Sequence, residues 1–447
     1  MEENLVQRSG QGQLASAALL SPAAKSPQLY GLGVLAINIM LESFSGYAYF
    51  FYVEVLGLAM SLAAVVRMIY SIWNSANDPI FAFFSDNTRS RWGRRHVWLV
   101  PAMLLTAAVY VLIFSVPESL HGANDLFRYM LLILLLFETL MTILIVNYVP
   151  LFPEYFRDLR QRSTAAAYYH AGKIIAVLIG LSLTPLVYGA IGFTGMAITY
   201  AALSVGLLAI ALAGNREDPQ LQAADRIKFL PALGNVLHDR SFWRFGITIT
   251  LVLFGVNMVP FALPFYVKYA LGGGPGMISV LSAAALLASL LTLPVWGRLV
   301  RMRNVKSTFV TAIRVMFLGT LILALPPNPW TGIPAMMVIG AAWGGIWVCN
   351  NIIRADLVSQ NLRQTEKHTE ALYYALLNVI QNAGGILQSA AMLLASLLFG
   401  YVSGENPGPH PDMAFRFLIG FAPLVVLVIS WFAARSFFRN YPEPLAA

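Results

Sequence analysis

Apolar segments long enough to cross a lipid bilayer recur twelve times along the chain and constrain its fold more than any other feature. A membrane-spanning helix needs about 20 mainly apolar residues. The composition agrees: 58% of the residues are hydrophobic and 11% are charged, against about 25% charged residues in soluble domains. We expect an all-α integral membrane protein with twelve transmembrane helices, at residues 30–53, 61–84, 97–116, 127–148, 163–188, 194–213, 242–269, 277–300, 308–325, 330–353, 371–402 and 413–438.

A polar segment divides these helices six and six. We predict two six-helix bundles at residues 29–213 and 241–438, joined by a central loop at residues 214–240. Residues 1–28 are polar and lack an apolar core followed by a cleavage site, which predicts a disordered tail and not a signal peptide. Residues 439–447 form a second tail, and we expect a monomer.

Lys and Arg residues are distributed unevenly between the two sides of the predicted membrane protein. They cluster in the connections after the second, fourth, sixth, eighth and tenth helices. The opposite connections contain little beyond Arg128, Lys268 and Arg416. Because basic loops stay on the cytoplasmic side, both termini and the central loop are predicted to be cytoplasmic, in a multi-pass protein of the cytoplasmic membrane.

One carboxylate, Asp78, lies inside the second apolar segment, shortly before the arginine-rich connection. A charged side chain at the centre of a bilayer costs roughly 2.5–3.5 kcal/mol on insertion scales. Such a residue is retained for a function or as a structural cap or ion pair, and the cost favours a function. Asp78 is therefore the first candidate for a transport site.

Other kinds of activity find no support in the sequence. The chain shows no phosphate-binding Gly-rich loop, no nucleophile with a base and no clustered metal ligands. Its one cysteine, Cys349, lies in an apolar segment. The net charge of +8 comes from short clusters and not from a continuous stripe. We expect no enzyme, cofactor, metal site or nucleic-acid partner; the expected partners are a small-molecule substrate and the lipid bilayer.

Two neighbouring motifs carry a family resemblance: Asn77-Asp78-Pro79 and the sequence Thr-Arg-Ser-Arg-Trp-Gly-Arg-Arg at 88–95. Together they resemble the glycoside–pentoside–hexuronide:cation symporters, the melibiose-permease-like branch of the major facilitator superfamily. Residues 52–58, 150–154 and 266–272 agree. The resemblance implies alternating access of two bundles with a sugar between them, and a cation held by acids of the second and fourth helices.

Most of the family's charged positions are neutral in this chain. The family's second acid of the second helix falls on Asp78, and its first acid there falls on Asn74. The acids of the first and fourth helices fall on Asn38 and Ile145. The arginine of the fifth helix falls on His170, and the lysine of the eleventh helix falls on Asn382 or on a residue beside it. Sodium prefers several hard oxygen ligands, but a proton needs one titratable group. The resemblance with these changes implies proton coupling, or no coupling, more than sodium coupling.

Several buried charges lie one or two helical turns from the replaced positions. Glu42 follows Asn38, Glu138 precedes Ile145, and Lys173 follows His170 at spacings that share a helix face. We predict that Glu42, Asp78, Glu138 and Lys173 form a relocated charge network that includes an Asp78–Lys173 pair. Lys173 could instead extend toward the membrane surface, and His170 could be a structural histidine or part of a proton route.

The remaining candidate residues belong to a gate and to substrate contacts. Asp86 with Arg89 or Arg94 is predicted to form a cytoplasmic gate of weak, state-dependent ion pairs. Aromatic and amide side chains suit stacking and hydrogen bonding to a sugar. The candidates for substrate contact are therefore Tyr148, Trp343, Trp347 and Asn350; simple packing is the alternative for each.

The predicted function is transport of a sugar or glycoside. Transport of a lysolipid or another amphiphile is the first alternative, and a membrane scaffold or sensor that transports nothing is the second.

Overall fold

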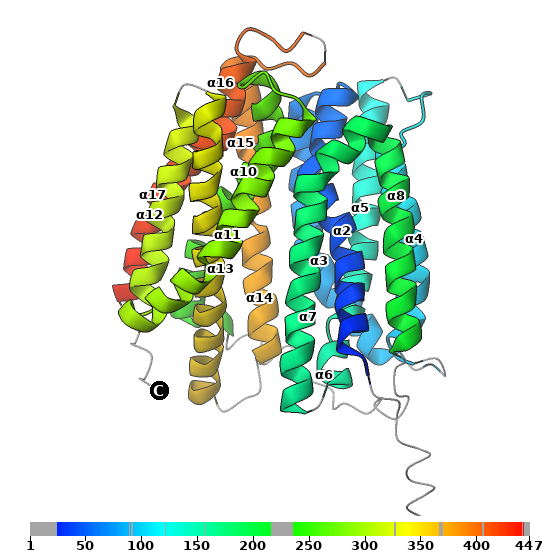
Figure 1. The fold of residues 1–447 in the computed structure, drawn as a ribbon, viewed down its shortest axis with the longest axis vertical. Coiled ribbons are helices and arrows are strands. Elements are labelled where there is room, and N and C mark those ends of the chain that lie inside the picture. Colours follow the sequence, from blue (N-terminus) through cyan, green and yellow to red (C-terminus); the bar gives the residue numbers. More distant parts are fainter. Residues whose placement is uncertain are drawn as a thin grey trace, which may run out of the picture.

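The computed structural model describes residues 25–88, 90, 93–120, 122–156, 158–215, 236–325, 328–365, 370–404, 406–439 and 441. Within these ranges the regular structure is helical, without strands. The helices run side by side, with those of the N-terminal half at the right and those of the C-terminal half at the left of the view (Figure 1). This confirms the all-α class expected from the apolar segments.

The N-terminal half begins with a long helix continued by a π-helical turn, and its fifth crossing has the same construction. In each π turn the backbone hydrogen bonds differ from the i→i−4 bonds of an α-helix, but the helix continues. The elements of this half are α2 (Pro27–Phe50), η1 (Phe51–Val55), α3 (Met60–Asn87), α4 (His96–Phe114), α5 (Ala123–Tyr148), α6 (Leu151–Tyr155), α7 (Leu159–Val177), η2 (Leu178–Leu183) and α8 (Thr184–Gly214).

The C-terminal half contains the other six crossings, two of which are interrupted. Its elements are α10 (Arg240–Tyr269), α11 (Pro275–Arg303), α12 (Val305–Ala324), α13 (Pro329–Thr365), α14 (Glu370–Asn382), α15 (Gly384–Phe399), α16 (Pro411–Arg416), η4 (Phe417–Phe421) and α17 (Ala422–Arg439).

Ten helical stretches are apolar and long enough to span a membrane, and two further observations bring the crossings of the described chain to twelve. The stretch from Arg160 to Gly214 is too long for one span. It turns at Gly192, whose φ of 74° lies in the left-handed region open to glycine. α3 is not among the ten because its polar residues lower its hydropathy, yet it runs alongside the others (Figure 1).

Glycines set the closest helix contacts in both halves. A Cβ on Gly172 of α7 would lie 2.4 Å from the carbonyl oxygen of Gly31 in α2. In the other half, a Cβ on Gly340 of α13 would lie 1.8 Å from the carbonyl oxygen of Ala285 in α11. Small residues allow such approach in membrane bundles, where packing replaces the hydrophobic effect as the driving force.

Helices of the two halves meet in several pairs. α3 packs against α14 and α15, α2 against α10, and α11 against α8 and η2. We call the end at which α2 begins and α17 ends the terminal end, and the opposite end, which carries η1 and the connection from α15 to α16, the distal end (Figure 1). The α3 contact surface contains the candidate site.

Candidate functional site

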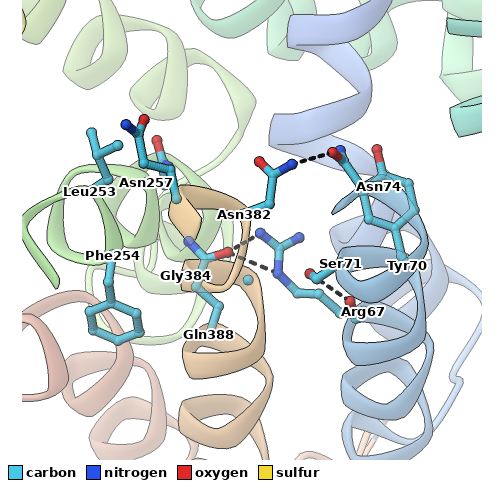
Figure 2. Close-up of a pocket in the computed structure, with 12 residues that line it drawn as sticks. Arg67, Tyr70, Ser71, Asn74, Leu253, Phe254, Asn257, Asn382, Gly384 and Gln388 are labelled. Atoms are coloured by element: carbon cyan, nitrogen blue, oxygen red, sulfur yellow. Dashed lines mark hydrogen bonds between the residues drawn. The ribbon is translucent and has the colours of Figure 1, made fainter. Parts of the chain in front are cut away.

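A cavity of about 140 Å³ lies between the two halves. It is bounded by α3 on one side and by α10, α14 and α15 on the other (Figure 2). Its lining is mainly polar: Arg67, Tyr70, Ser71, Asn74, Leu253, Phe254, Asn257, Gln381, Asn382, Gly384, Gly385 and Gln388. A polar space at the contact of two bundles is where a transporter of this architecture binds its substrate.

The spacing of polar residues along α3 explains why Arg67, Ser71 and Asn74 line one cavity, with Asp78 one turn beyond them on the same face. Arg67, Ser71, Asn74 and Asp78 follow one another at intervals of three or four residues, which places them on a single helix face. The opposite face of α3 carries apolar residues such as Ile72 and Ile80, which are exposed at the bundle surface. α3 is thus amphipathic, and its polar face is turned toward the other half of the protein.

Two side-chain bridges cross the cavity between the halves. The guanidinium of Arg67 donates to the amide oxygen of Gln388, from Nε at 2.9 Å and also from a terminal nitrogen. About two turns nearer the terminal end, Nδ2 of Asn382 donates to Oδ1 of Asn74 at 2.6 Å. Asn74 and Asn382, chosen from the sequence as separate candidates, therefore lie in the same cavity.

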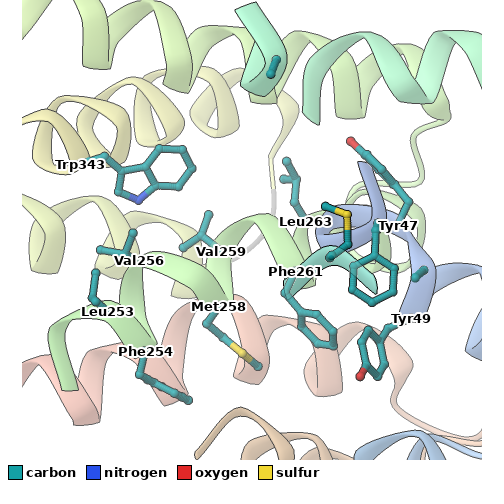
Figure 3. Close-up of a cluster of buried hydrophobic side chains, with 14 of the residues drawn as sticks. Tyr47, Tyr49, Leu253, Phe254, Val256, Met258, Val259, Phe261, Leu263 and Trp343 are labelled. Carbon is teal, nitrogen blue, oxygen red and sulfur yellow. The ribbon is translucent and has the colours of Figure 1, made fainter. Parts of the chain in front are cut away.

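Two aromatic rings contact Arg67, which lines this cavity. The guanidinium of Arg67 lies 4.9 Å from the ring centroid of Tyr49 and 4.8 Å from that of Phe261. The two rings approach each other edge to face at 5.7 Å. Figure 3 shows them within the buried apolar cluster formed by α2 and α10. The side chain of Arg67 thus lies against this apolar cluster.

Asp78 lies beside two neutral oxygen groups. The Thr142 hydroxyl of α5 lies 3.2 Å from Oδ1 of Asp78 and 3.1 Å from Oδ1 of Asn77, so it donates to one of them. Asp78 is half-buried and Asn77 is fully buried. A carboxylate, an amide oxygen and a hydroxyl together present a small oxygen-rich group that suits a proton or another small cation.

Glu138 of α5 contacts the wall of the cavity through a tyrosine. It is 5% exposed, and its carboxylate accepts a hydrogen bond from the hydroxyl of Tyr70, which lines the cavity. Glu138 also lies close enough to Asp78 for electrostatic repulsion. Two acids of the predicted charge network are thus near each other, on adjacent helices.

The other two members of that network lie elsewhere. Lys173 of α7 is exposed and interacts electrostatically with Glu42 across the contact of α2 with α7. Among the ion pairs of the described chain there is none between Lys173 and Asp78. His170 is also exposed, with its ring edge-on to Tyr169 at 5.2 Å. The predicted Asp78–Lys173 pair is not formed in this structure.

Two of the predicted substrate contacts make structural hydrogen bonds in the N-terminal half. Nδ2 of Asn38 donates to the carbonyl of Val34 in its own helix at 2.8 Å. The hydroxyl of Tyr148 donates to the carbonyl of Tyr30 at 2.8 Å, and the two rings stack at 5.0 Å. Tyr148 is buried. The contacts of Tyr148 hold α5 against α2, whereas that of Asn38 lies within α2; neither residue belongs to the cavity lining.

The candidates on α13 also lie outside the cavity lining. Trp343 is buried in the apolar cluster with residues of α10 (Figure 3), and Trp347 is 44% exposed. Asn350 is completely buried, and neither polar atom of its side chain has a hydrogen-bond partner. A role for these three residues in substrate contact stays a prediction.

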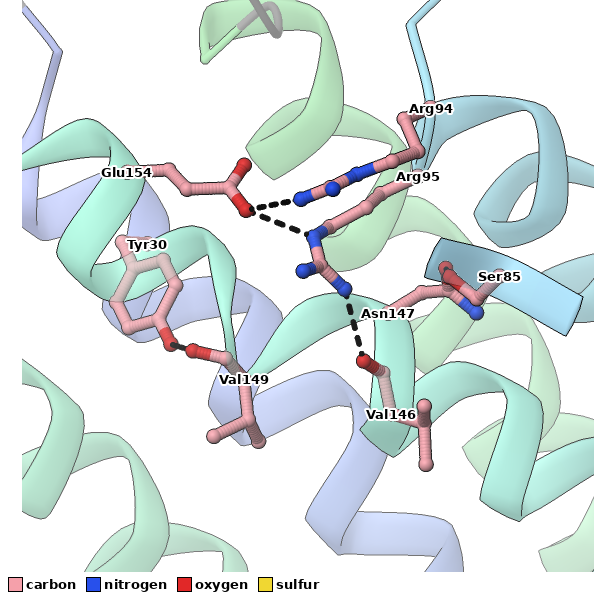
Figure 4. Close-up of polar contacts among 8 residues, drawn as sticks. All are labelled: Tyr30, Ser85, Arg94, Arg95, Val146, Asn147, Val149 and Glu154. Atoms are coloured by element: carbon pink, nitrogen blue, oxygen red, sulfur yellow. Dashed lines mark hydrogen bonds and ion pairs between the residues drawn. The ribbon is translucent and has the colours of Figure 1, made fainter. Parts of the chain in front are cut away.

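The arginine-rich connection at the terminal end is tied to its own half. Arg94 and Arg95 form ion pairs with Oε1 of Glu154 in α6 at 2.9 and 3.0 Å (Figure 4). Arg95 also donates to the carbonyl of Val146 at 3.2 Å. Arg89 and the side chain of Asp86 lie outside the described residues. The predicted gate between Asp86 and Arg89 or Arg94 therefore stays a prediction.

A second polar cluster joins the two halves at the distal end. The carboxylate of Glu54 in η1 forms an ion pair with Lys268 and accepts hydrogen bonds from Tyr269 at 2.7 Å and Tyr401 at 3.0 Å. Burial and the adjacent Glu54 carboxylate raise the pKa of Tyr401 above its usual range, so this hydroxyl remains a donor. We call Glu54, Lys268, Tyr269 and Tyr401 the distal latch.

Sequence reasoning missed several of these residues. Arg67 had a clear signal, because it is a charge inside an apolar segment, seven residues before Asn74. Asn77 and Thr142 are neutral and carry no such signal. Glu54 directly follows a predicted span and Lys268 lies in the last turn of another, where charges are common. Their pairing depends on the arrangement of the two halves.

Comparisons with known proteins agree with this architecture. A family model described as MFS/sugar transport protein matches residues 29–442. An uncharacterized symporter of Synechocystis sp. is 29% identical over 46% of this chain, an alignment that spans 40% of that relative. The isoprimeverose transporter of Lactiplantibacillus pentosus is 23% identical over 82% of both chains.

Two further similarities are to a symporter named for a lipid substrate and to a transporter of known structure. The sodium-dependent lysophosphatidylcholine symporter 1 of Gallus gallus is 22% identical over 63% of both chains. The crystal structure of the nucleoside transporter NupG superposes with a TM-score of 0.66 at 14% identity, covering 93% of this chain and 99% of that one. With its twelve crossings and the match to nearly its whole length, the chain belongs to the MFS/sugar transport protein family of the major facilitator superfamily.

Proposed function

We propose that this protein is a secondary active transporter that moves a sugar or glycoside across the cytoplasmic membrane by alternating access. The observation that carries the proposal is the polar cavity between α3 and the C-terminal half. Amide groups there can exchange hydrogen bonds with hydroxyls, which is the chemistry of sugar recognition. A site at the contact of the halves is also the one that a rocking motion would expose to each side in turn.

The orientation of the protein follows from the basic residues. The terminal end carries the arginine-rich connection with Arg94 and Arg95, so we assign it to the cytoplasm. The distal latch then lies on the outer side, where it holds the halves together. With this orientation, we infer that this conformation is held closed at the outer side by the distal latch.

We assign cation coupling to Asp78, with a proton favoured over sodium. Glu138 and Asp78 repel each other, and neither forms an ion pair with a described basic side chain. Two ionised acids in an apolar bundle are costly, so a proton on one of them is favoured. Protonation of Asp78 removes this penalty. The two halves can then pass through the closed intermediate between the outward-open and inward-open states.

A lysolipid is the second candidate substrate. It is favoured by the similarity to a protein named for lysophosphatidylcholine transport. The cavity is small compared with the roughly 300–1,000 Å³ of common ligand pockets. It fits a head group or a monosaccharide, and an acyl chain would have to lie between helices outside it.

Uptake into proteoliposomes separates these proposals. Purified protein would be tested with radiolabelled glycosides, pentoses and lysophosphatidylcholine under an imposed proton gradient, an imposed sodium gradient or none. The proposal predicts sugar uptake that a proton gradient increases. Lysolipid movement without sugar movement would support the second candidate, and stimulation by sodium alone would contradict proton coupling.

A further inference from the structure

We propose that the outer surface of the C-terminal half binds the phosphate group of an anionic phospholipid at the contact of α12 with α17. The lipid would belong to the surrounding bilayer and would not be transported. α12 and α17 form the left edge of the view in Figure 1 and contribute no residue to the lining of the cavity. The inference therefore does not depend on the substrate that the protein carries.

Arg314 is an exposed charge in the middle of a membrane-spanning helix. It is the tenth of the 20 residues of α12, which places it about 14 Å along the axis from Val305 at a rise of about 1.5 Å per residue. α12 packs against α11, α13, α17 and η4, all of the same half, so its exposed face is turned toward the bilayer. A charge at this depth is costly and usually faces the bundle interior or pairs with an opposite charge.

The helices around Arg314 offer almost no negative charge. α12 contains no acidic residue, and among α11, α13, α17 and η4 only α13 contains one, Asp356. That carboxylate accepts hydrogen bonds from Tyr441 and Gln360. The ion pairs among the described residues involve other basic side chains. An anion for Arg314 therefore has to come from outside this half of the protein.

The exposed face of α12 changes from polar to apolar along its length. Ser307, Thr311 and Arg314 follow one another at intervals of four and three residues, which places them on one helix face. Leu318 and Leu321 continue that face toward the distal end and are exposed. A phospholipid has the same order, with a polar head group at the membrane surface and acyl chains toward the middle of the bilayer.

The end of α17 lies beside this polar stretch. The ammonium group of Lys306 donates to the carbonyl of Phe438 at 3.0 Å, and the ring centroids of Phe309 and Phe438 lie 6.0 Å apart. The two helices run in opposite directions, so residues after Phe309 lie beside residues before Phe438 (Figure 1). Arg314 and Arg435 are therefore about 7.5 and 4.5 Å along the axes from this contact, at similar depths in the bilayer.

The cations at this contact keep N–H donors for a phosphate. The guanidinium of Arg435 stacks on the ring of Trp431 at 3.8 Å, and a stacked guanidinium retains the donors that lie in its plane. Lys306 gives one of its three N–H donors to Phe438. Guanidinium groups form strong, charge-assisted hydrogen bonds with phosphate oxygens. We call Lys306, Arg314 and Arg435 the outer basic site.

The surroundings of the outer basic site favour a phospholipid over a soluble anion. The terminal end is assigned to the cytoplasm, and basic pockets between helices on that side bind anionic head groups. The neighbouring surface of α17 exposes Val425, Val428 and Phe432, which suits contact with acyl chains. A soluble phosphate would gain nothing from this apolar surface.

Lipid binding to the full chain tests the inference. Purified protein in detergent micelles would be mixed with phosphatidylglycerol or with phosphatidylcholine of the same acyl chains, and bound lipid would be counted by native mass spectrometry. Each basic residue near a membrane surface contributes about fivefold to the binding of an anionic lipid, so we expect phosphatidylglycerol to bind roughly tenfold more tightly or better. Phosphatidylglycerol should also raise the thermal unfolding midpoint, and inorganic phosphate should not.

Variants locate this preference. Arg314→Leu should lower it about fivefold, and the double variant with Arg435→Gln should lower it further. Arg160→Gln, which removes an exposed arginine of α7 at the terminal end of the other half, should leave it unchanged.

Several results would overturn the inference. Equal binding of the two lipids to wild type does so even if the variants fail to fold, and so does stabilisation by inorganic phosphate alone. A preference that survives in the folded double variant, or that falls equally in Arg160→Gln, also overturns it. A wild-type dimer that Arg314→Leu converts to a monomer would show that a second copy of the chain, and not a lipid, covers Arg314.

Discussion

The carboxylate of Glu54 forms an ion pair with the ammonium group of Lys268, and this contact joins the two halves at the distal end. Glu54 is buried, whereas Lys268 is about half exposed. The pair can therefore break without moving two charges out of the apolar interior. Its two tyrosine donors make Glu54 the centre of the distal latch.

Replacing Glu54 by Gln should favour opening at the distal end. The change removes charge from an acceptor of several hydrogen bonds, and a hydrogen bond to a charged group contributes about 1.5–3 kcal/mol. We expect a shift of tenfold or more toward the state open at the distal end. Spin labels introduced at Asn124 and Gly276, both exposed at that end, would report it as a longer distance distribution. Glu118→Gln, an exposed change, is the control.

Tyr401→Phe should open the same latch by less. It removes one donor at 3.0 Å from Glu54, a hydrogen bond to a charged group worth about 1.5–3 kcal/mol, and leaves the ring, the Lys268 ion pair and the Tyr269 hydrogen bond in place. Burial raises the pKa of Tyr401, so its neutral form, the donor, persists as pH rises through the ordinary tyrosine range near 10. The difference between wild type and Tyr401→Phe should then be the same at pH 7 and pH 9. A difference that disappears at pH 9 would contradict this assignment.

Tyr70→Phe should destabilise the protein by leaving the buried carboxylate of Glu138 without its hydroxyl donor. An unsatisfied buried polar group costs about 1–3 kcal/mol. Adding Glu138→Leu to Tyr70→Phe should restore part of the stability, because both polar partners are then absent. Thermal unfolding of the two single variants and the double variant measures this coupling. Additive losses would show that the two side chains act independently.

Gly340→Ala should prevent the close approach of α13 to α11. The new Cβ would lie 1.8 Å from the carbonyl oxygen of Ala285, so the helices would have to separate. Gly297→Ala in α11 is the matched control, because a Cβ there meets no atom within 4 Å. Gly340→Ala should lower the thermal unfolding midpoint by several degrees, and Gly297→Ala should not. Equal midpoints would mean that this contact is not tightly packed.

The fold was predictable from the sequence because its determinants are local. Segment length and hydropathy identify most of the crossings; α3 falls outside the ten apolar stretches because its polar face lowers its hydropathy, and its crossing was predicted from the apolar residues at 61–84. The division into halves followed from one polar segment, and the match over residues 29–442 confirms the expected family. These features depend on composition over about 20 residues and not on which helices touch.

The site was predictable only in part because it depends on contacts between helices. The sequence identified Asn74 and Asn382 separately, but their 2.6 Å hydrogen bond needs α3 beside α14. Arg67 could have been found by the rule that identified Asp78, since both are charges in an apolar segment. Thr142 gave no signal until the structure placed its hydroxyl beside Asp78. Its contact is made across two helices that the sequence does not show to be neighbours.

The central claim is that Asp78 couples solute movement to a proton. The decisive measurement compares wild type and Asp78→Asn in proteoliposomes, as uptake driven by a proton gradient and as exchange of solute without a gradient. The account predicts that Asp78→Asn loses gradient-driven accumulation but retains exchange, because the amide keeps the shape of the site and cannot carry the proton. Undiminished accumulation by Asp78→Asn under a proton gradient would contradict it.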